Sequence, residues 1–104
     1  MGGTREGLRD RSKALFGNRD RLEVMVAIVR SGNNVVCAAD LEKELGLANN
    51  RVRTQLIALS DAGVLTALPP GRGDRIVWYQ RRESPLWDLS VALYEDWSGR
   101  SSPD

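Results

Sequence analysis

Residues 39–65 read ADLEKELGLANNRVRTQLIALSDAGVL, and this stretch decides the fold. Leu41 and Leu45 are four residues apart, so they share one face of a short helix. Asp40 is placed to cap that helix, and Gly46 is placed to end it. We therefore expect a first short helix that ends in a tight turn.

A second helix follows this turn. Val52, Leu56 and Leu59 recur at helical spacing, which predicts one buried stripe, and Gly63 stops the helix. Two short helices joined by a turn that carries glycine are typical of a helix-turn-helix. The second helix of that motif can enter the major groove of DNA.

The polar side of the second helix carries residue types that suit this task. Arginine can donate two hydrogen bonds to guanine, and asparagine or glutamine can do the same to adenine. Threonine can bond a phosphate or touch a thymine methyl group. The same side chains could simply face water, as on any amphipathic helix, and this helix alone does not decide between the two readings. The residues that we predict to bind DNA here are Asn49, Asn50, Arg51, Arg53, Thr54 and Gln55.

A β-hairpin is predicted directly after the second helix. Residues 64–68 and 75–80 alternate as strands do, and residues 69–74 between them are rich in turn formers. Arg72 lies at the tip and Arg75 just behind it, where a phosphate or minor-groove contact would be made. The alternative is a plain surface hairpin.

The helix-turn-helix and hairpin belong to a core that spans residues 17–83. The remaining helices are predicted to support this core and to join two copies of it as a dimer. Residues 20–31 are apolar over a wide arc, as a central helix requires. Residues 1–16 form an arm with a weak helix that either docks on the fold or frays. Residues 84–97 form a helix with two apolar sides, one for its own core and one for a second subunit. Residues 98–104 are expected to be a disordered tail.

A homodimer is the expected assembly, because a partner would cover the second apolar side of the C-terminal helix. The residues that we predict at the dimer interface are Leu8, Leu15, Leu86, Trp87, Leu89, Val91, Tyr94 and Trp97.

Composition places the chain in a broad class. Its 104 residues fit one domain, and the net charge of +1 is unevenly spread, since residues 49–84 carry six basic and three acidic side chains. The single cysteine, Cys37, cannot form an intramolecular disulfide, and no apolar run is long enough to span a bilayer. We therefore expect a cytoplasmic protein that makes no membrane contact.

The order of helices and hairpin is that of a winged helix-turn-helix, a mainly α fold with a small β-hairpin. Over residues 15–80 the chain resembles bacterial arsenic-repressor-like (ArsR-type) regulators. The run Leu15 to Met25 resembles the entry to that family's first core helix, and Asp40-Leu41 through Leu45-Gly46-Leu47 resembles its helix-turn-helix opening. MarR-type and PadR-type regulators share the same skeleton. The resemblance implies a transcriptional regulator, and a repressor is expected.

One departure from that family concerns metal binding. Metal sensors of this type often carry Cys-x-Cys just before the Asp-Leu pair, whereas this chain has Cys37-Ala38-Ala39 and contains no histidine. One thiol cannot supply a soft metal site, so we predict neither a metal nor another cofactor.

Sequence-specific binding to double-stranded DNA is therefore the expected function, with no small-molecule effector identified. No histidine, phosphate loop or activated nucleophile supports catalysis, so we do not expect an enzyme. A winged-helix adaptor that binds protein and has lost DNA binding is the alternative, and the net charge near zero keeps it open.

Overall fold

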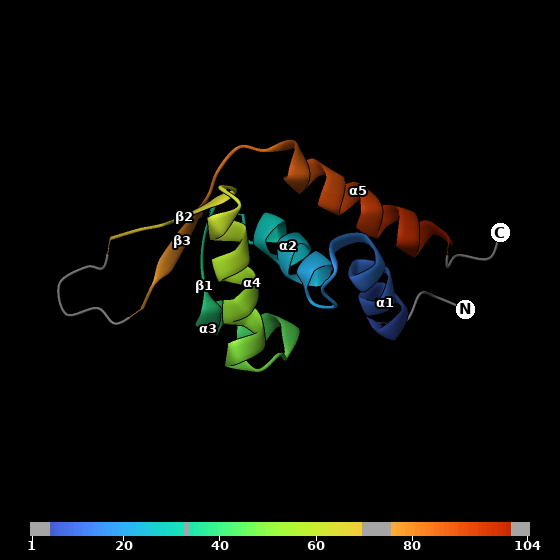
Figure 1. The fold of residues 1–104 in the computed structure, drawn as a ribbon, viewed down its shortest axis with the longest axis horizontal. Coiled ribbons are helices and arrows are strands. Elements are labelled where there is room, and N and C mark those ends of the chain that lie inside the picture. Colours follow the sequence, from blue (N-terminus) through green and yellow to red (C-terminus); the bar gives the residue numbers. More distant parts are fainter. Residues whose placement is uncertain (1–4, 33, 70–75, 101–104) are drawn as a thin grey trace.

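The computed structural model describes residues 5–32, 34–69 and 76–100, without the side chains of residues 99 and 100. Within this part of the chain the elements are α1 (Arg5–Phe16), α2 (Arg21–Arg30), β1 (Val35–Cys37), α3 (Ala38–Leu45), α4 (Asn49–Asp61), β2 (Leu65–Ala67), β3 (Trp78–Arg81) and α5 (Pro85–Arg100). Figure 1 shows α2 in the middle, with α1, α4 and α5 around it and the strands at the end away from the termini. The predicted fold class, a mainly α winged helix, is confirmed.

Helix α2 is the centre of the hydrophobic core. Its residues from Leu22 to Ile28 are all buried, and helices α1, α3, α4 and α5 each contact it. A helix that is apolar over most of its circumference avoids water only if neighbours cover every side. The wide apolar arc in the sequence therefore predicted its central place correctly.

Helix α1 docks on the core through both apolar and polar contacts. Leu8 is buried in the core, and the buried Ser12 hydroxyl donates to the carbonyl oxygen of Asn18 at 2.6 Å while accepting the Leu22 N–H at 2.9 Å. Arg5 and Arg9 both donate to the buried carboxylate of Glu23. The arm was expected either to dock on the fold or to fray, and in the structure its helix α1 is docked.

The helix-turn-helix consists of α3 and α4. Gly46 ends α3 with φ of 67°, and its N–H donates to the carbonyl oxygen of Glu42 at 2.7 Å. Glycine adopts this left-handed conformation without the strain that a Cβ atom would add. The predicted cap at Asp40 is wrong, because α3 already begins at Ala38. Asp40 lies instead in the first turn, where its charge suits the helix dipole.

The predicted hairpin is part of a three-stranded antiparallel sheet in the order β1-β3-β2. Strand β3 is central, with Val36 of β1 opposite Tyr79 and Thr66 of β2 opposite Gln80. The second strand begins three residues later than the predicted 75–80 and ends at Arg81. The added strand β1 ties the entry of the helix-turn-helix to the hairpin.

Helix α5 closes the core from the other side of α2. Ser84 accepts the Leu86 N–H through its hydroxyl at 3.1 Å, which agrees with the predicted start of this helix. Trp87 is buried, and its indole N–H donates to the carbonyl oxygen of Arg82 at 2.7 Å. The helix continues to Arg100, so the first three residues of the predicted tail are helical.

Candidate nucleic-acid interface

One stripe of α4 faces away from the core. Asn50, Arg53, Thr54 and Ile57 are all exposed, and their spacing of three, four and seven residues aligns them along the helix. Val52, Leu56 and Leu59 are buried on the opposite side, as predicted. We call Asn50, Arg53, Thr54 and Ile57 the outer stripe. It combines a cation, an amide, a hydroxyl and an aliphatic side chain, which are the groups used to read base edges.

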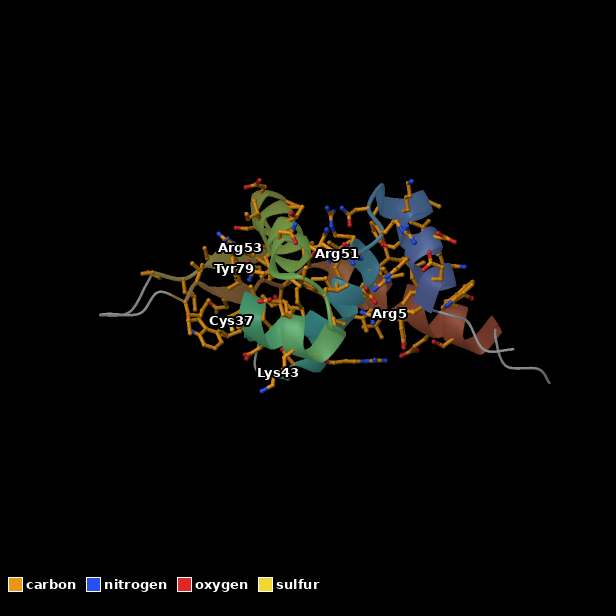
Figure 2. All side chains as sticks on the ribbon, turned by 90° about the horizontal axis from the view of Figure 1, so that it is seen from below. Arg5, Cys37, Lys43, Arg51, Arg53 and Tyr79 are labelled. Atoms are coloured by element: carbon orange, nitrogen blue, oxygen red, sulfur yellow. The ribbon has the colours of Figure 1, made fainter. Side chains whose placement is uncertain are left out.

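The polar side chains of the outer stripe differ in how many of their hydrogen-bonding groups already have a partner. The Thr54 hydroxyl donates to the carbonyl oxygen of Asn50 at 2.7 Å, so it still offers an acceptor and a methyl group. Arg53 makes no ion pair with a described residue, and it borders a shallow hollow shared with Ile76 and Tyr79 of the hairpin side. Figure 2 shows Arg53 and Tyr79 close together beside the strands. The Arg53 guanidinium is the single cation of the outer stripe.

Arg51 is held at the edge of α4 by an ion pair. It donates to both carboxylate oxygens of Asp20, at 3.0 and 2.6 Å, and Asp20 precedes α2. Hydrogen bonding to this carboxylate raises the pKa of Arg51 above its ordinary value, so the guanidinium stays charged. Arg51 can contact a phosphate only by sharing or leaving Asp20. Asn49 is also engaged, because its amide donates to Glu42 at 2.8 Å.

Gln55 is not part of this surface, and its predicted contact with DNA is wrong. It is only 1% exposed, and its side-chain oxygen accepts a hydrogen bond from Arg21 at 2.7 Å. Residue 55 directly precedes Leu56 on the flank of the buried stripe, so the backbone directs its side chain inward. Its polar character is satisfied inside the fold rather than by solvent.

The hairpin contributes Ile76 and Val77, which are both exposed. The predicted wing-tip residues Arg72 and Arg75 lie outside the described residues. Sequence reasoning missed the apolar members of the surface, Ile57 on α4 and the pair on the hairpin. The signal for Ile57 was its position, since it lies seven residues after Asn50 and therefore on the same side of the helix.

Cys37 belongs to the interior. It is buried opposite Trp78 in the sheet, and burial, aided by the nearby Asp40 carboxylate, raises the pKa of its thiol. The backbone N–H groups of Asp40 and Ala39 act in the opposite direction and only offset part of this shift. In the described ranges, no three His, Cys, Asp or Glu side chains come together as a metal site would require.

The residues predicted at a dimer interface fall into three environments. Leu8 and Trp87 are buried in the chain's own core, so they are not available to a partner and this part of the prediction is wrong. Four others are half-buried: Leu86, Val91, Tyr94 and Trp97. Leu15 and Leu89 remain about half exposed, at 52% and 50%. Among the predicted residues, these two offer the most apolar surface.

These features define a winged helix-turn-helix of the kind found in transcriptional regulators. A solved structure with this fold is the crystal structure of AntR, described as an antimony-specific transcriptional repressor. The two structures align with a TM-score of 0.59 and 26% sequence identity, over 84% of this chain and 79% of that chain. No family model and no curated protein matches the sequence. None of the helices in the described ranges has the length and apolar content that a bilayer span requires.

Proposed function

We propose that this chain is a sequence-specific DNA-binding protein that represses transcription as a homodimer and is a relative of the ArsR-type regulators. The observation that carries the proposal is the outer stripe of α4, which stands exposed beside the hairpin of a winged helix. Asn50, Arg53 and Thr54 would contact bases, with Asn49 and Arg51 nearer the phosphates. Arg72 and Arg75 of the hairpin would hold the flanking backbone. The likeness to a repressor supports this function.

The proposed homodimer suits the geometry of an inverted repeat in DNA. An inverted repeat presents equivalent grooves about 34 Å apart, and a two-fold dimer offers two equivalent reading helices at that separation. Leu15 of α1 and Leu89 of α5 are the exposed apolar residues from which such an interface would be built. The hairpins would then lie at the outer ends of the bound site.

Selection of bound sites from a random duplex pool tests the proposal directly. We expect a recovered inverted repeat, which would establish both base recognition and two-fold symmetry. Affinity for the recovered site should fall steeply as salt rises, because each neutralised phosphate releases counterions. Failure to enrich any sequence would contradict the proposal.

A protein-binding adaptor is the second candidate, and two side chains favour it. Arg51 is tied to Asp20 and Gln55 is buried, so α4 has fewer free donors than its sequence suggests. The same salt titration separates the two functions. An adaptor should bind random duplex weakly at every salt concentration, whereas a DNA-binding protein should bind it tightly at low salt.

A further inference from the structure

The side of α4 that faces α2 is distinct from the outer stripe. Arg51 and Gln55 are four residues apart, so both lie on this side, which we call the α2 flank. Figure 2 shows Arg51 toward α2, whereas Arg53 lies toward the strands. A helix with its side chains is roughly 10–12 Å wide, about as wide as the major groove. The two flanks of a helix in the groove therefore face the phosphates of the two DNA strands.

Arg21, the first residue of α2, brings a second guanidinium to the α2 flank. Its Nε–H donates to the side-chain oxygen of Gln55 at 2.7 Å. Gln55 is buried and closely packed, so the acceptor is held in place, while Arg21 itself is only half-buried. A guanidinium has five N–H donors, and this bond uses one of them. The four donors on the η nitrogens have no partner among the described residues.

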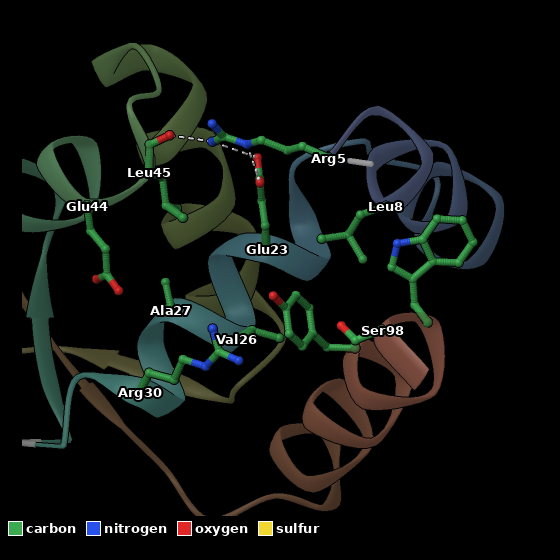
Figure 3. Close-up of a pocket in the computed structure, with 11 residues that line it drawn as sticks. Arg5, Leu8, Glu23, Val26, Ala27, Arg30, Glu44, Leu45 and Ser98 are labelled. Atoms are coloured by element: carbon green, nitrogen blue, oxygen red, sulfur yellow. Dashed lines mark hydrogen bonds and ion pairs between the residues drawn. The ribbon is translucent and has the colours of Figure 1, made fainter. Parts of the chain in front are cut away.

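The positive charge of Arg21 is not neutralised, because its partner is an uncharged amide. Among the described residues it makes no ion pair. The acidic side chains near the start of α2 have other partners. Asp20 accepts from Arg51, and Figure 3 shows Glu23 bonded to Arg5 of α1. The α2 flank thus carries one arginine paired with a carboxylate and one whose charge is available.

The buried amide of Gln55 has a cost that core packing does not explain. An aliphatic side chain at this position would fill similar space without needing a hydrogen-bond partner. What the amide adds is a fixed acceptor for Arg21. An arginine that is already ordered loses less side-chain entropy when it binds an anion, so the bond prepares Arg21 for a ligand.

We propose that Arg21 binds a phosphate of the DNA strand along the α2 flank, and that Gln55 is the residue that positions it. This inference rests on the proposed function, since it assigns one more contact in the same complex. The hairpin lies on the opposite flank of α4, so the groove is held from both sides. A phosphate contact carries no sequence information, and Gln55 therefore acts on affinity through Arg21 and leaves base preference unchanged.

Salt titrations with a random duplex and with the selected site test the phosphate contact. Arg21→Gln should weaken binding to both, roughly tenfold at 0.1 M salt, and should make the slope of log affinity against log salt shallower by about 0.9. Arg30→Gln is the matched control, because it removes the same charge from the exposed last residue of α2. It should change the slope much less.

Two results of this titration contradict different claims. A parent protein that binds DNA with a steep salt dependence, but whose Arg21→Gln and Arg30→Gln variants behave alike, overturns the assignment of Arg21 and leaves the proposed function standing. A parent protein that binds neither duplex at low salt overturns the proposed function, and this inference with it.

A double-mutant cycle tests the part of Gln55. Gln55→Met keeps a similar volume but removes the acceptor, so affinity for the random duplex should fall about three- to tenfold as Arg21 loses its fixed position. In the Arg21→Gln background the same substitution should have no further effect. An equal loss in both backgrounds would show that Gln55 acts on DNA without Arg21 and would refute its positioning role.

A second substitution at the same position adds a test that keeps the acceptor. Gln55→Glu retains an oxygen for the Arg21 Nε–H but neutralises its charge, as Asp20 does for Arg51. It should make the salt slope shallower by about the same amount as Arg21→Gln does. Denaturant titration checks that each variant is folded before DNA is added. An unchanged slope in folded Gln55→Glu would overturn the proposal, even where Gln55→Met fails to fold.

Discussion

Arg53 and Gln55 are close neighbours on α4, but their surroundings predict opposite effects of substitution. Arg53→Ala should leave the fold intact and weaken binding to a selected DNA site by about 1–3 kcal/mol, because an exposed base contact is lost. Gln55→Ala should instead lower the free energy of unfolding by about 1–2 kcal/mol, because a buried hydrogen bond and its packing are lost. Denaturant titration and DNA titration of both variants measure the two effects. The assignment is wrong if Gln55→Ala has the larger effect on base preference in a folded protein.

The ion pair between Asp20 and Arg51 leads to a second prediction about single residues. Asp20→Asn should raise affinity for random duplex and steepen its salt dependence by up to about one unit, because Arg51 is released to contact a phosphate. It should also lower stability, since the ion pair ties α4 to the start of α2.

Asp10→Asn is the matched control for this prediction, because it also removes one negative charge, from an exposed site on α1. It should change the affinity for random duplex much less than Asp20→Asn does. Equal effects of the two substitutions would mean that only net charge matters and that Arg51 has no special part.

The outer stripe as a whole supplies a prediction for the element α4. Ile57 is 48% exposed among polar neighbours, and an aliphatic side chain in a major groove can contact the methyl group of thymine. Replacing one thymine of the selected site by deoxyuridine should therefore weaken binding of the parent about fourfold, the value of one buried methyl group. Ile57→Ala should be insensitive to that same replacement, while Arg53→Ala should remain sensitive. If no single deoxyuridine distinguishes Ile57→Ala from the parent, Ile57 does not contact a thymine.

The elements that could be predicted from sequence are those with a strong local signal. The helical spacing of Val52, Leu56 and Leu59 defined α4, and the wide apolar arc of α2 predicted its central place. The run Val35-Val36-Cys37 indicates a short extended piece, which is strand β1, but its pairing with β3 depends on contacts distant in sequence, so no local pattern revealed that pairing. The position of Gln55 was predicted wrongly, because its polar side chain alone was taken as a sign that it is exposed.

The candidate site was predicted less completely than the fold. Asn50, Arg53 and Thr54 are exposed as expected, but whether a donor is free depends on tertiary partners. Asp20 lies 31 residues from Arg51, and Arg21 lies 34 residues from Gln55. Such partners are invisible until the helices are packed. The apolar sides of α5 were likewise ambiguous, because the core and a second subunit attract the same residues.

For the whole molecule, the property to be measured is the oligomeric state. Light scattering of the full chain at tens of micromolar should give the mass of a dimer, and Leu89→Glu should give a monomer, because a charge would be placed in the proposed interface. Val77→Glu, an equally exposed apolar position on the hairpin, should remain dimeric. A monomeric parent protein would contradict the dimer outright. Deleting α5 is a poorer test, because Trp87 belongs to the core and its loss would unfold the chain.

The pairing of β1 with β3 also has a consequence for how the protein is made. Helices α3 and α4 lie in the chain between these two strands, so the sheet that braces them cannot close until β3 has left the ribosome. The cover that α5 gives to α2 comes later still, because α5 follows β3 in the chain. A nascent chain stalled before β3 therefore has helix α4 without the finished support of the sheet. We expect this fold to acquire its native packing only after both β3 and α5 have left the ribosome.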